Sequence, residues 1–212
     1  MNKEQQLEEL AQTIKHCQNC ALYQKATQAV PGEGNSQSTV MFIGEGPGFY
    51  EDREGRPFVG QAGKLLDKLL ASINLPRKEV FIGNVVKHRP PENRDPLPQE
   101  IEACRPFLDK QIEIIDPRMI VTLGRYSLNK FLPGEFISKV HGQARFVDFA
   151  GKKMIVIPMY HPAAALRSSI IMEEIKKDFQ KIVQFLERNE NLLENQLVKS
   201  EDKKESDQMS LI

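Results

Sequence analysis

The chain has 212 residues, of which 40% are hydrophobic and 27% are charged, and its 29 basic side chains balance 29 acidic ones. This length and composition predict one folded domain with a packed core. A formal charge of zero excludes the broad basic surface of proteins that bind nucleic acid through net charge alone. The sequence contains no run of about 18 apolar residues, so we expect no membrane-spanning helix.

The first ten residues, MNKEQQLEEL, are polar and lack the apolar centre of a secretory signal. The chain contains three cysteines, which in a sequence without a leader favour a reducing cytoplasm and thiolate ligands over disulfides. We therefore expect a cytoplasmic protein without a membrane partner.

Hydrophobic periodicity predicts an alternation of helices and strands along the chain. Apolar residues at helical spacing predict helices at 7–14, 65–73, 98–112, 125–132 and 175–185. Short apolar runs predict strands at 40–43, 80–86, 119–123, 145–149 and 153–158. Strands separated by helices indicate an α/β fold with a mostly parallel sheet and helices on both faces.

The sequence has no internal repeat and becomes polar and charged from about Asn189. We predict one domain over residues 1–188 and a disordered tail over residues 189–212. Nothing in the sequence indicates self-association, so a monomer is the expected state.

Cys17 and Cys20 form a C-x-x-C pair near the start of the chain, and His88 and Cys104 flank a proline-rich loop far downstream. Two ligands close in sequence and two distant ones indicate a metal or iron–sulfur site rather than a redox pair. Such a site would tie the N-terminal segment to the middle of the domain.

Polar groups follow three of the predicted strands. Glu45 comes directly after the first, Asn84 lies near the end of the second, and His161 follows the last. Because ligands of α/β sheets bind at the carboxyl ends of the strands, these side chains predict a common site. A turn residue for Asn84 and a structural histidine for His161 are the alternatives.

Three segments resemble the motif blocks of the family 4 uracil-DNA glycosylases, a branch of the uracil-DNA glycosylase superfamily: GEGPGFYEDREGRPFVGQAGKLLDKLL, GNVVKHRPPENRDP and MYHPAAALR. With the cysteine pair and Cys104, the similarity runs over residues 7–168. The resemblance implies a three-layer α/β/α fold with a central, mostly parallel four-stranded sheet. It also implies an enzyme of base excision repair that flips deoxyuridine out of single- or double-stranded DNA and hydrolyses the N-glycosidic bond.

The resemblance further implies roles for individual side chains. Phe58 would stack on uracil, although its sequence position also fits a core aromatic. Asn84 would read uracil N3–H and O4, and His161 would donate a hydrogen bond to O2 as a neutral imidazole. Glu45 and Glu51 would stabilise the cationic sugar and orient water, and Glu51 would also crowd the C5 position of the base.

The remaining implied contacts are made by the backbone and by the residues after His161. Backbone amides from Gly46 through Gly48 to Phe49 would bind uracil, since small residues allow close approach, although Phe49 itself is unusually bulky. Leu166 and Arg167 would enter the minor groove and fill the gap left by the flipped base. A core position in the following helix is the alternative for Leu166.

The family holds a [4Fe–4S] cluster with four cysteines, and His88 occupies the position of one of them. Histidine ligates iron in Rieske centres, so we predict a cluster on Cys17, Cys20, His88 and Cys104, with zinc, a degraded three-iron cluster or an empty site as alternatives. The related X-type branch shares Val-Lys-His here but adds a basic loop ending in a nucleophilic histidine. Residues 89–103 contain no histidine, so we predict ordinary turnover.

A catalytically weak or inactive DNA-binding paralogue with a Cys3His metal site is the alternative function. The presence of Glu45, Asn84 and His161 in one chain favours the enzyme.

Overall fold

The computed structural model describes residues 1–186, so the tail predicted at 189–212 lies outside the described residues. A six-stranded sheet in the order β1-β3-β2-β4-β6-β5 forms the centre of the molecule. Its four inner strands are parallel and comprise β3 (Phe81–Asn84), β2 (Val40–Gly44), β4 (Met119–Leu123) and β6 (Lys152–Met159). Antiparallel strands β1 (Glu33–Gly34) and β5 (Arg145–Phe149) form the two edges.

The predicted mostly parallel sheet is confirmed, but it has six strands rather than four because an antiparallel strand adds to each edge. The strand predicted at 145–149 pairs with β6 as one edge. The other edge, β1, has two residues, which is too short to leave a periodic pattern in the sequence. The strand predicted at 80–86 ends earlier, at Asn84, although the amides of Val85 and Val86 still donate to carbonyls at the end of β2 and just beyond it.

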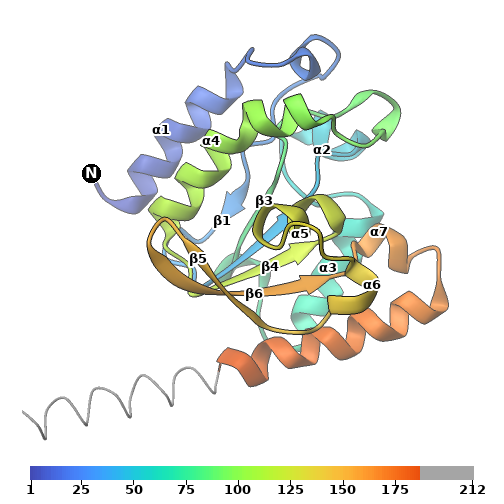
Figure 1. The fold of residues 1–212 in the computed structure, drawn as a ribbon. Helices are drawn as coiled ribbons and strands as arrows, with labels where there is room; N and C mark the ends of the chain where they lie inside the picture. Colours follow the sequence, from blue (N-terminus) through green and yellow to red (C-terminus); the bar gives the residue numbers. More distant parts are fainter. Residues whose placement is uncertain (187–212) are drawn as a thin grey trace, which may run out of the picture.

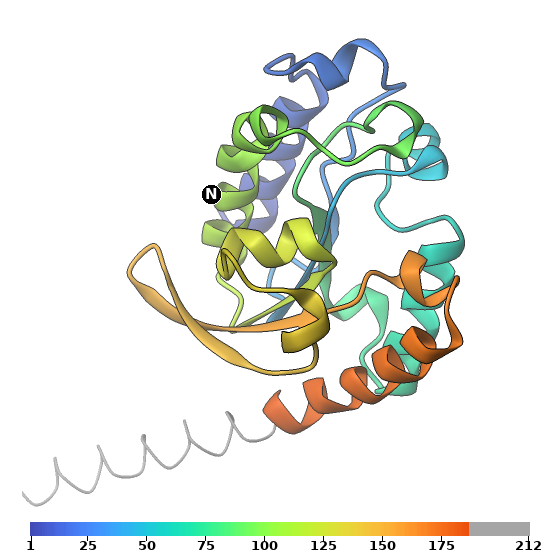
Figure 2. The same ribbon diagram turned by 45° about the vertical axis from the view of Figure 1, so that its right-hand side comes forward.

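Helices cover both faces of the sheet (Figures 1 and 2). One face packs against α1 (Lys3–Lys15), α4 (Pro98–Ile115) and α5 (Arg125–Phe131). The other face packs against α3 (Gln61–Ser72) and the last helix, residues 169–186. Within the described part of the chain, no helix is long and apolar enough to cross a membrane.

Shorter helices connect these elements: α2 (Phe49–Glu54), α6 (Ile137–Val140) and α7 (Pro162–Ala165), with 3-10 turns at Ala21–Gln24, Arg77–Glu79 and Pro91–Asn93. Of these, α2 follows β2 and α7 follows β6, so both lie at the carboxyl ends of parallel strands. The arrows of β4 and β6 in Figure 1 point toward the side of the molecule where α7 lies.

Alternate side chains of the inner strands build two apolar cores, one on each face of the sheet. Phe42 points to the α3 face, where its ring stacks on Phe179 of the last helix with 5.9 Å between centroids. Its neighbours Met41 and Ile43 point to the opposite face and pack in the core that contains Leu108 of α4. The doubly covered sheet holds the ends of its parallel strands in a fixed arrangement.

Candidate active site

The four parallel strands end at a pocket of about 720 Å³. Glu45 follows β2, Asn84 ends β3, Gly124 follows β4 and His161 lies just after β6, and all four residues line this pocket. The structure therefore brings together the three polar side chains that the sequence places at strand ends.

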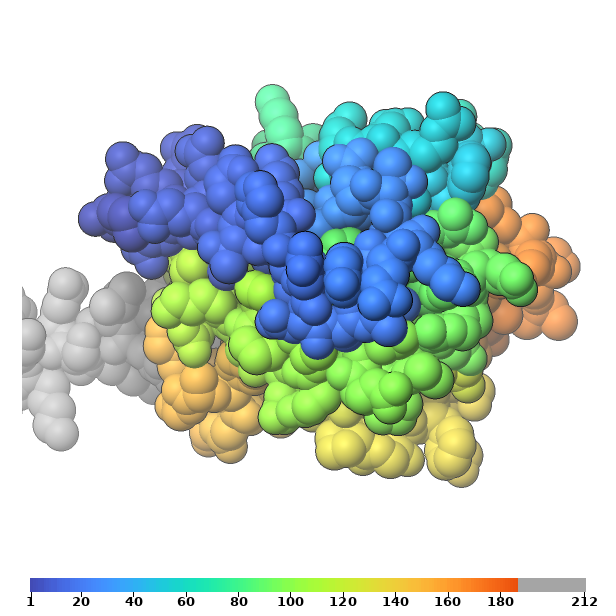
Figure 3. Space-filling model, turned by 90° about the horizontal axis from the view of Figure 1, so that it is seen from above, coloured from blue at the N-terminus to red at the C-terminus, as the bar shows by residue number. Residues whose placement is uncertain are grey.

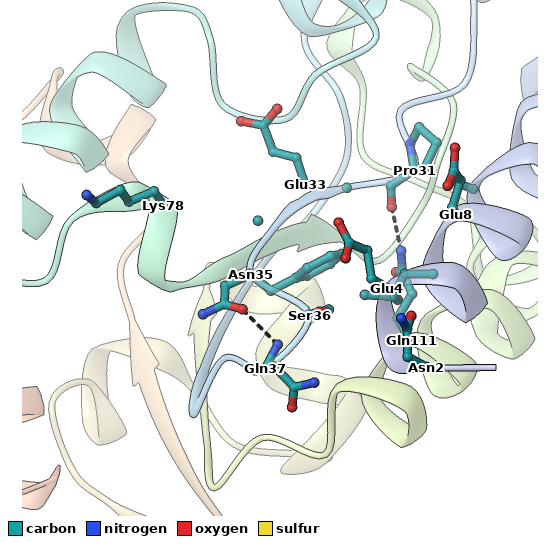
Figure 4. A pocket seen from close by; sticks show the side chains of 15 residues that line it. Asn2, Glu4, Glu8, Pro31, Glu33, Asn35, Ser36, Gln37, Lys78 and Gln111 are labelled. Atoms are coloured by element: carbon teal, nitrogen blue, oxygen red, sulfur yellow. Dashed lines mark hydrogen bonds between the residues drawn. The ribbon is translucent and has the colours of Figure 1, made fainter.

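A second cavity, of about 620 Å³, lies between α1 and the β1 edge of the sheet (Figure 4). Glu4, Glu8 and Glu33 border it, and on its wall the Gln111 amide donates a hydrogen bond to the Pro31 carbonyl at 2.7 Å. Arg56 and Arg77 form ion pairs with Glu33, but Glu4 and Glu8 still disfavour the approach of a phosphate backbone. Among the described residues, the lining includes no histidine or cysteine. The pocket at the strand ends is the better candidate for chemistry.

Phe58 and His161 stand together on one side of the strand-end pocket. Their rings stack with 5.5 Å between centroids and 27° between planes. Phe58 is 5% exposed and has a left-handed φ of 51°. This turn docks directly on α3 at Gly63, where a Cβ would lie 1.8 Å from the Phe58 carbonyl oxygen. The glycine therefore fixes the position of the aromatic wall.

His161 is held as a neutral hydrogen-bond donor. Its Nδ1 accepts a hydrogen bond from the Ala163 amide at 3.1 Å, which assigns the ring proton to Nε2. Burial lowers the pKa of His161 to about 4, although the nearby Glu51 carboxylate opposes this shift. At neutral pH the imidazole is uncharged and offers one N–H from Nε2.

Asn84 presents an unsatisfied acceptor. The residue is 1% exposed, and its Oδ1 is buried without a hydrogen-bond partner among the described residues. A Cβ on Gly44 would lie 2.4 Å from this oxygen and 2.6 Å from Cζ of Phe58, so only glycine lets β2 approach so closely. Leaving such an acceptor unpaired costs about 1–3 kcal/mol, which a donor on a ligand would recover.

Glu45 is fixed at the start of α5. One carboxylate oxygen accepts a hydrogen bond from the Tyr126 amide at 3.1 Å. Burial raises the pKa of Glu45, while the amides of Tyr126 and Arg125 act in the opposite direction. Gly124 has a φ of 101° and would place a Cβ 2.5 Å from Glu45 Oε1, so this turn also requires glycine.

Glu51 has a structural contact that the sequence did not predict. Its Oε1 accepts hydrogen bonds from the amides of Val59 and Gly60, both at 2.9 Å. The carboxylate thus holds the turn that carries Phe58 against α2. Its Oε2 lies beside Gly48, where a Cβ would be 2.7 Å away.

The predicted contacts with base and DNA fall into two groups. Gly46, Gly48 and Arg167 line the pocket, whereas Phe49 and Leu166 do not. Phe49 is 46% exposed and Leu166 is 47% exposed. The alternative of a core position for Leu166 is therefore wrong.

Sequence patterns did not single out Lys87, which is 1% exposed. Its ammonium donates hydrogen bonds to the Asn84 carbonyl at 2.9 Å and to Gln111 Oε1 at 2.7 Å. Burial lowers the pKa of Lys87 to about 8. The side chain therefore ties the end of β3 to α4. Tyr160 and Arg125 were also missed and line the pocket directly.

The predicted metal ligands lie where the N-terminal segment meets the loop after β3 and α4. Figure 3 shows this blue segment packed against the green one. The thiols of Cys17, Cys20 and Cys104 lie close together, because Cys17 and Cys104 affect the pKa of Cys20, and Cys17 and Cys20 affect the pKa of Cys104. Burial raises the pKa of Cys104 to about 11, so this thiol would bind as a thiolate only if a metal displaces its proton. Burial lowers the pKa of His88, which favours the neutral, metal-binding imidazole.

His88 and Cys17 line a common cavity of about 280 Å³. Within residues 1–186, no three histidine, cysteine, aspartate or glutamate side chains are arranged to hold a single metal ion. The donor set of three thiols and one neutral imidazole nevertheless suits an iron–sulfur cluster, so these residues fit that group by their chemistry.

Known proteins have similar sequences over most of the chain's length. Residues 31–187 match the family model of the uracil DNA glycosylase superfamily. The type-4 uracil-DNA glycosylase of Saccharolobus solfataricus is 47% identical over 205 residues, which cover 94% of this chain and 95% of that protein. The type-4 enzyme of Archaeoglobus fulgidus is 47% identical over 181 residues, covering 83% and 91%. A type-5 uracil-DNA glycosylase of Pyrobaculum aerophilum is 31% identical over 152 residues, covering 63% and 65%.

These matches and the α/β fold make the chain a member of the uracil-DNA glycosylase superfamily. Within the superfamily it belongs to family 4, as the sequence motifs predicted.

Proposed function

We propose that the protein flips deoxyuridine out of DNA and hydrolyses its N-glycosidic bond, which releases uracil and leaves an abasic site. A base inside a duplex is inaccessible to a pocket of this depth, so the nucleotide must leave the stack. Membership of family 4 supports the reaction. The observation that carries the site assignment is the buried Asn84 Oδ1, which has no hydrogen-bond partner within residues 1–186 and lies beside the stacked rings of Phe58 and His161.

Asn84 explains the choice of uracil. Its Oδ1 would accept a hydrogen bond from uracil N3–H, and its amide nitrogen would donate to O4. Cytosine has an acceptor at N3 and a donor at N4, so it would oppose both groups. Phe58 supplies the aromatic wall for stacking, and the backbone at Gly46 and Gly48 allows the base to approach closely.

The bond cleavage places a positive charge on the sugar and a negative charge on the departing base. The electron pair of the C1′–N1 bond moves onto uracil, where His161 Nε2–H stabilises the charge developing at O2. Glu45 lies where its carboxylate would stabilise the cationic sugar and orient a water molecule toward C1′. Water supplies the new hydroxyl at C1′, and its proton balances the uracil anion.

Other residues position these groups and the DNA. Glu51 holds the Phe58 turn, and we propose that its second oxygen helps to orient the water and to exclude the methyl group of thymine. Leu166 and Arg167 would contact the minor groove beside the flipped nucleotide. Because one chain lines the whole pocket, a monomer suffices for the reaction.

We propose a [4Fe–4S] cluster on Cys17, Cys20, His88 and Cys104, with zinc or a degraded three-iron cluster as the alternative. When bound, it would cross-link three separate segments of the chain, and hydrolysis requires no redox step. The polypeptide already connects this region to the pocket.

Two hydrogen bonds donated by backbone amides make that connection. The Thr27 amide donates to Asp52 of α2 at 2.9 Å, and the Val30 amide donates to the Lys87 carbonyl at 2.7 Å. The segment that follows the cysteine pair is thereby attached both to α2 and to the loop after β3.

The test uses oligonucleotides with one deoxyuridine, as single strands and as duplexes, followed by alkaline cleavage of abasic sites. We expect strand scission with the wild-type protein and little with Asn84→Asp purified in parallel, which controls for contaminating glycosylases. The absence of product from both substrates would contradict the proposed function.

A further inference from the structure

Two aromatic side chains are exposed at the start of α2. Phe49 is 46% exposed and Tyr50 is 55% exposed, and their rings meet edge to face with 5.4 Å between centroids. About half of each side chain therefore remains in contact with solvent. Paired aromatic rings at a surface commonly mark a site of molecular contact.

The aromatic pair lies at the rim of the strand-end pocket. Phe49 directly follows Gly48, which lines the pocket. The Tyr50 ring packs over Gly60, where a Cβ would lie 3.3 Å from Tyr50 Cδ2 and 3.4 Å from Glu51 Oε1. Figures 2 and 3 show α2 beside the loop that follows β3. A nucleotide next to one held in the pocket would therefore lie within reach of the pair.

Two arginines accompany the aromatic rings. The guanidinium groups of Arg53 and Arg89 lie 5.6 Å and 5.2 Å from the centroid of the Phe49 ring. Within residues 1–186, neither arginine forms an ion pair. The Nε of Arg89 donates a hydrogen bond to Asn93 Oδ1 at 2.8 Å, so its two terminal amino groups are the ones that would contact phosphate. In the same part of the chain no cation lies over the Tyr50 ring, which leaves Tyr50 as the aromatic surface open to a base.

We propose that Tyr50 stacks on an unpaired base adjacent to the flipped uracil in single-stranded DNA. Phe49 supports the tyrosine ring from the side, and Arg53 and Arg89 bind the neighbouring phosphates. Aromatic stacking combined with basic groups is how many proteins hold single strands, because every base has a face to stack. In a duplex the neighbouring base is already stacked and paired, so Tyr50 would add little. This inference rests on the proposed function and specifies its preferred substrate.

The test measures binding to oligonucleotides that carry a non-hydrolysable 2′-fluoro-deoxyuridine, by fluorescence anisotropy at one fixed salt concentration. In a second set of strands, the nucleotide on either side of the uracil is replaced by an abasic analogue. We expect removal of one flanking base to weaken binding of the wild-type protein about 5- to 50-fold. Tyr50→Ala should lower the affinity for the intact strand by the same factor. It should cause no further loss of affinity for the strand with the abasic analogue, because the mutation and the base removal abolish the same interaction.

Two variants serve as controls. Tyr50→Phe keeps the ring and should bind like the wild type. Phe146→Ala removes an aromatic side chain that is 73% exposed on β5, at an edge of the sheet, and should leave binding unchanged. On duplex DNA, Tyr50→Ala should change affinity less than about twofold.

Equal losses on single strands and duplexes, or additive losses from Tyr50→Ala and base removal, would overturn the stacking proposal. Uracil release by the wild-type protein is measured separately on a cleavable strand. If the wild-type protein releases uracil but the losses of affinity are additive, the stacking proposal is refuted and the proposed function stands. Absence of release refutes the function, while the binding assay still tests the stacking.

Discussion

The strand-end pocket and the cysteine–histidine region are built in different ways. In the pocket, backbone amides orient two of the proposed catalytic groups: the Ala163 amide orients His161, and the Tyr126 amide orients Glu45. In the cysteine–histidine region, the three thiols lie close together, but the residues as they stand form no site for a single metal ion within residues 1–186.

This difference separates the roles of the two regions. In the proposed mechanism, the strand ends hold the donors and acceptors of the pocket in place before the base binds, and preorganised groups of this kind supply much of the rate enhancement of enzymes. The cysteine–histidine region joins segments that are distant in sequence, so we expect it to contribute to the stability and position of the surrounding loops. Changes in the pocket should therefore affect the rate of cleavage, whereas changes in the ligands should first affect metal content and thermal stability.

The largest effect is expected for Asn84→Asp. A carboxylate would place a buried negative charge against uracil O4 and would lose the amide donor. We expect kcat/KM for uracil excision to fall about 10³-fold, as measured by single-turnover and steady-state assays. Asn129→Asp, at an exposed position of α5, is the matched control and should retain wild-type rates. A loss below tenfold for Asn84→Asp would remove this residue from uracil recognition.

A smaller loss is expected for Gly44→Ala, which tests the preorganisation of the pocket. The new methyl group would overlap Asn84 Oδ1 and the Phe58 ring, at 2.4 Å and 2.6 Å. Displacing both groups by a few tenths of an ångström to one ångström should reduce kcat/KM about 10- to 100-fold.

Gly83→Ala is the control for this prediction. It lies next to Asn84 on β3, but its Cβ would make only ordinary contacts, the nearest at 3.7 Å. Similar losses for both variants would mean that general disturbance of the sheet, rather than the contact with Asn84 and Phe58, limits activity.

The parts of the pocket that sequence reasoning found are those tied to strand ends. Glu45, Asn84 and His161 each follow apolar residues of a strand, so the rule for parallel sheets predicts from the sequence that they lie together. The hydrogen bonds that hold the end of β3 in place were not predictable in this way. Lys87 reaches inward from the loop to Asn84 and Gln111, and Gln111 is distant in sequence. Only the three-dimensional packing of α4 against β3 reveals that pairing.

The edge strand β1 and the exposure of Leu166 are two further features that local sequence does not predict, because they depend on the tertiary structure. A two-residue strand such as β1 forms because β3 offers a free edge, which is a property of the fold rather than of local sequence. Leu166 follows three alanines in an apolar stretch that suits a core helix, yet α7 ends at Ala165 and leaves the leucine exposed. The exposure of Leu166 therefore follows from where α7 ends, and the length of a helix depends on tertiary contacts.

Cys104→Ser tests the second region and should affect stability more than chemistry. Loss of this ligand should lower the iron content and the visible absorbance of anaerobically purified protein, and it should lower Tm by about 5–10 °C. We expect kcat at low temperature to fall less than tenfold, because no pocket residue is removed. His88→Cys should keep the iron content at or above that of the wild type. A rate loss as large as that of Asn84→Asp would show that the two regions do not act separately.

The smallest effect concerns pH, where the low pKa of His161 should keep this imidazole neutral on mild acidification. Because the pKa of His161 is lowered to about 4 in the folded protein, its Nε2–H donor form persists well below the usual histidine value of about 6.5. Between these values the unfolded chain binds a proton that the folded chain does not, so this residue makes the free energy of unfolding fall as pH decreases from about 6.5 to 4. Imidazole NMR spectra, assigned with His161→Gln, should show His161 uncharged at pH 5.5. Titration of His161 near pH 6.5 would contradict this prediction. It would mean that the imidazole is not desolvated and that its N–H is bound to water before any base enters the pocket.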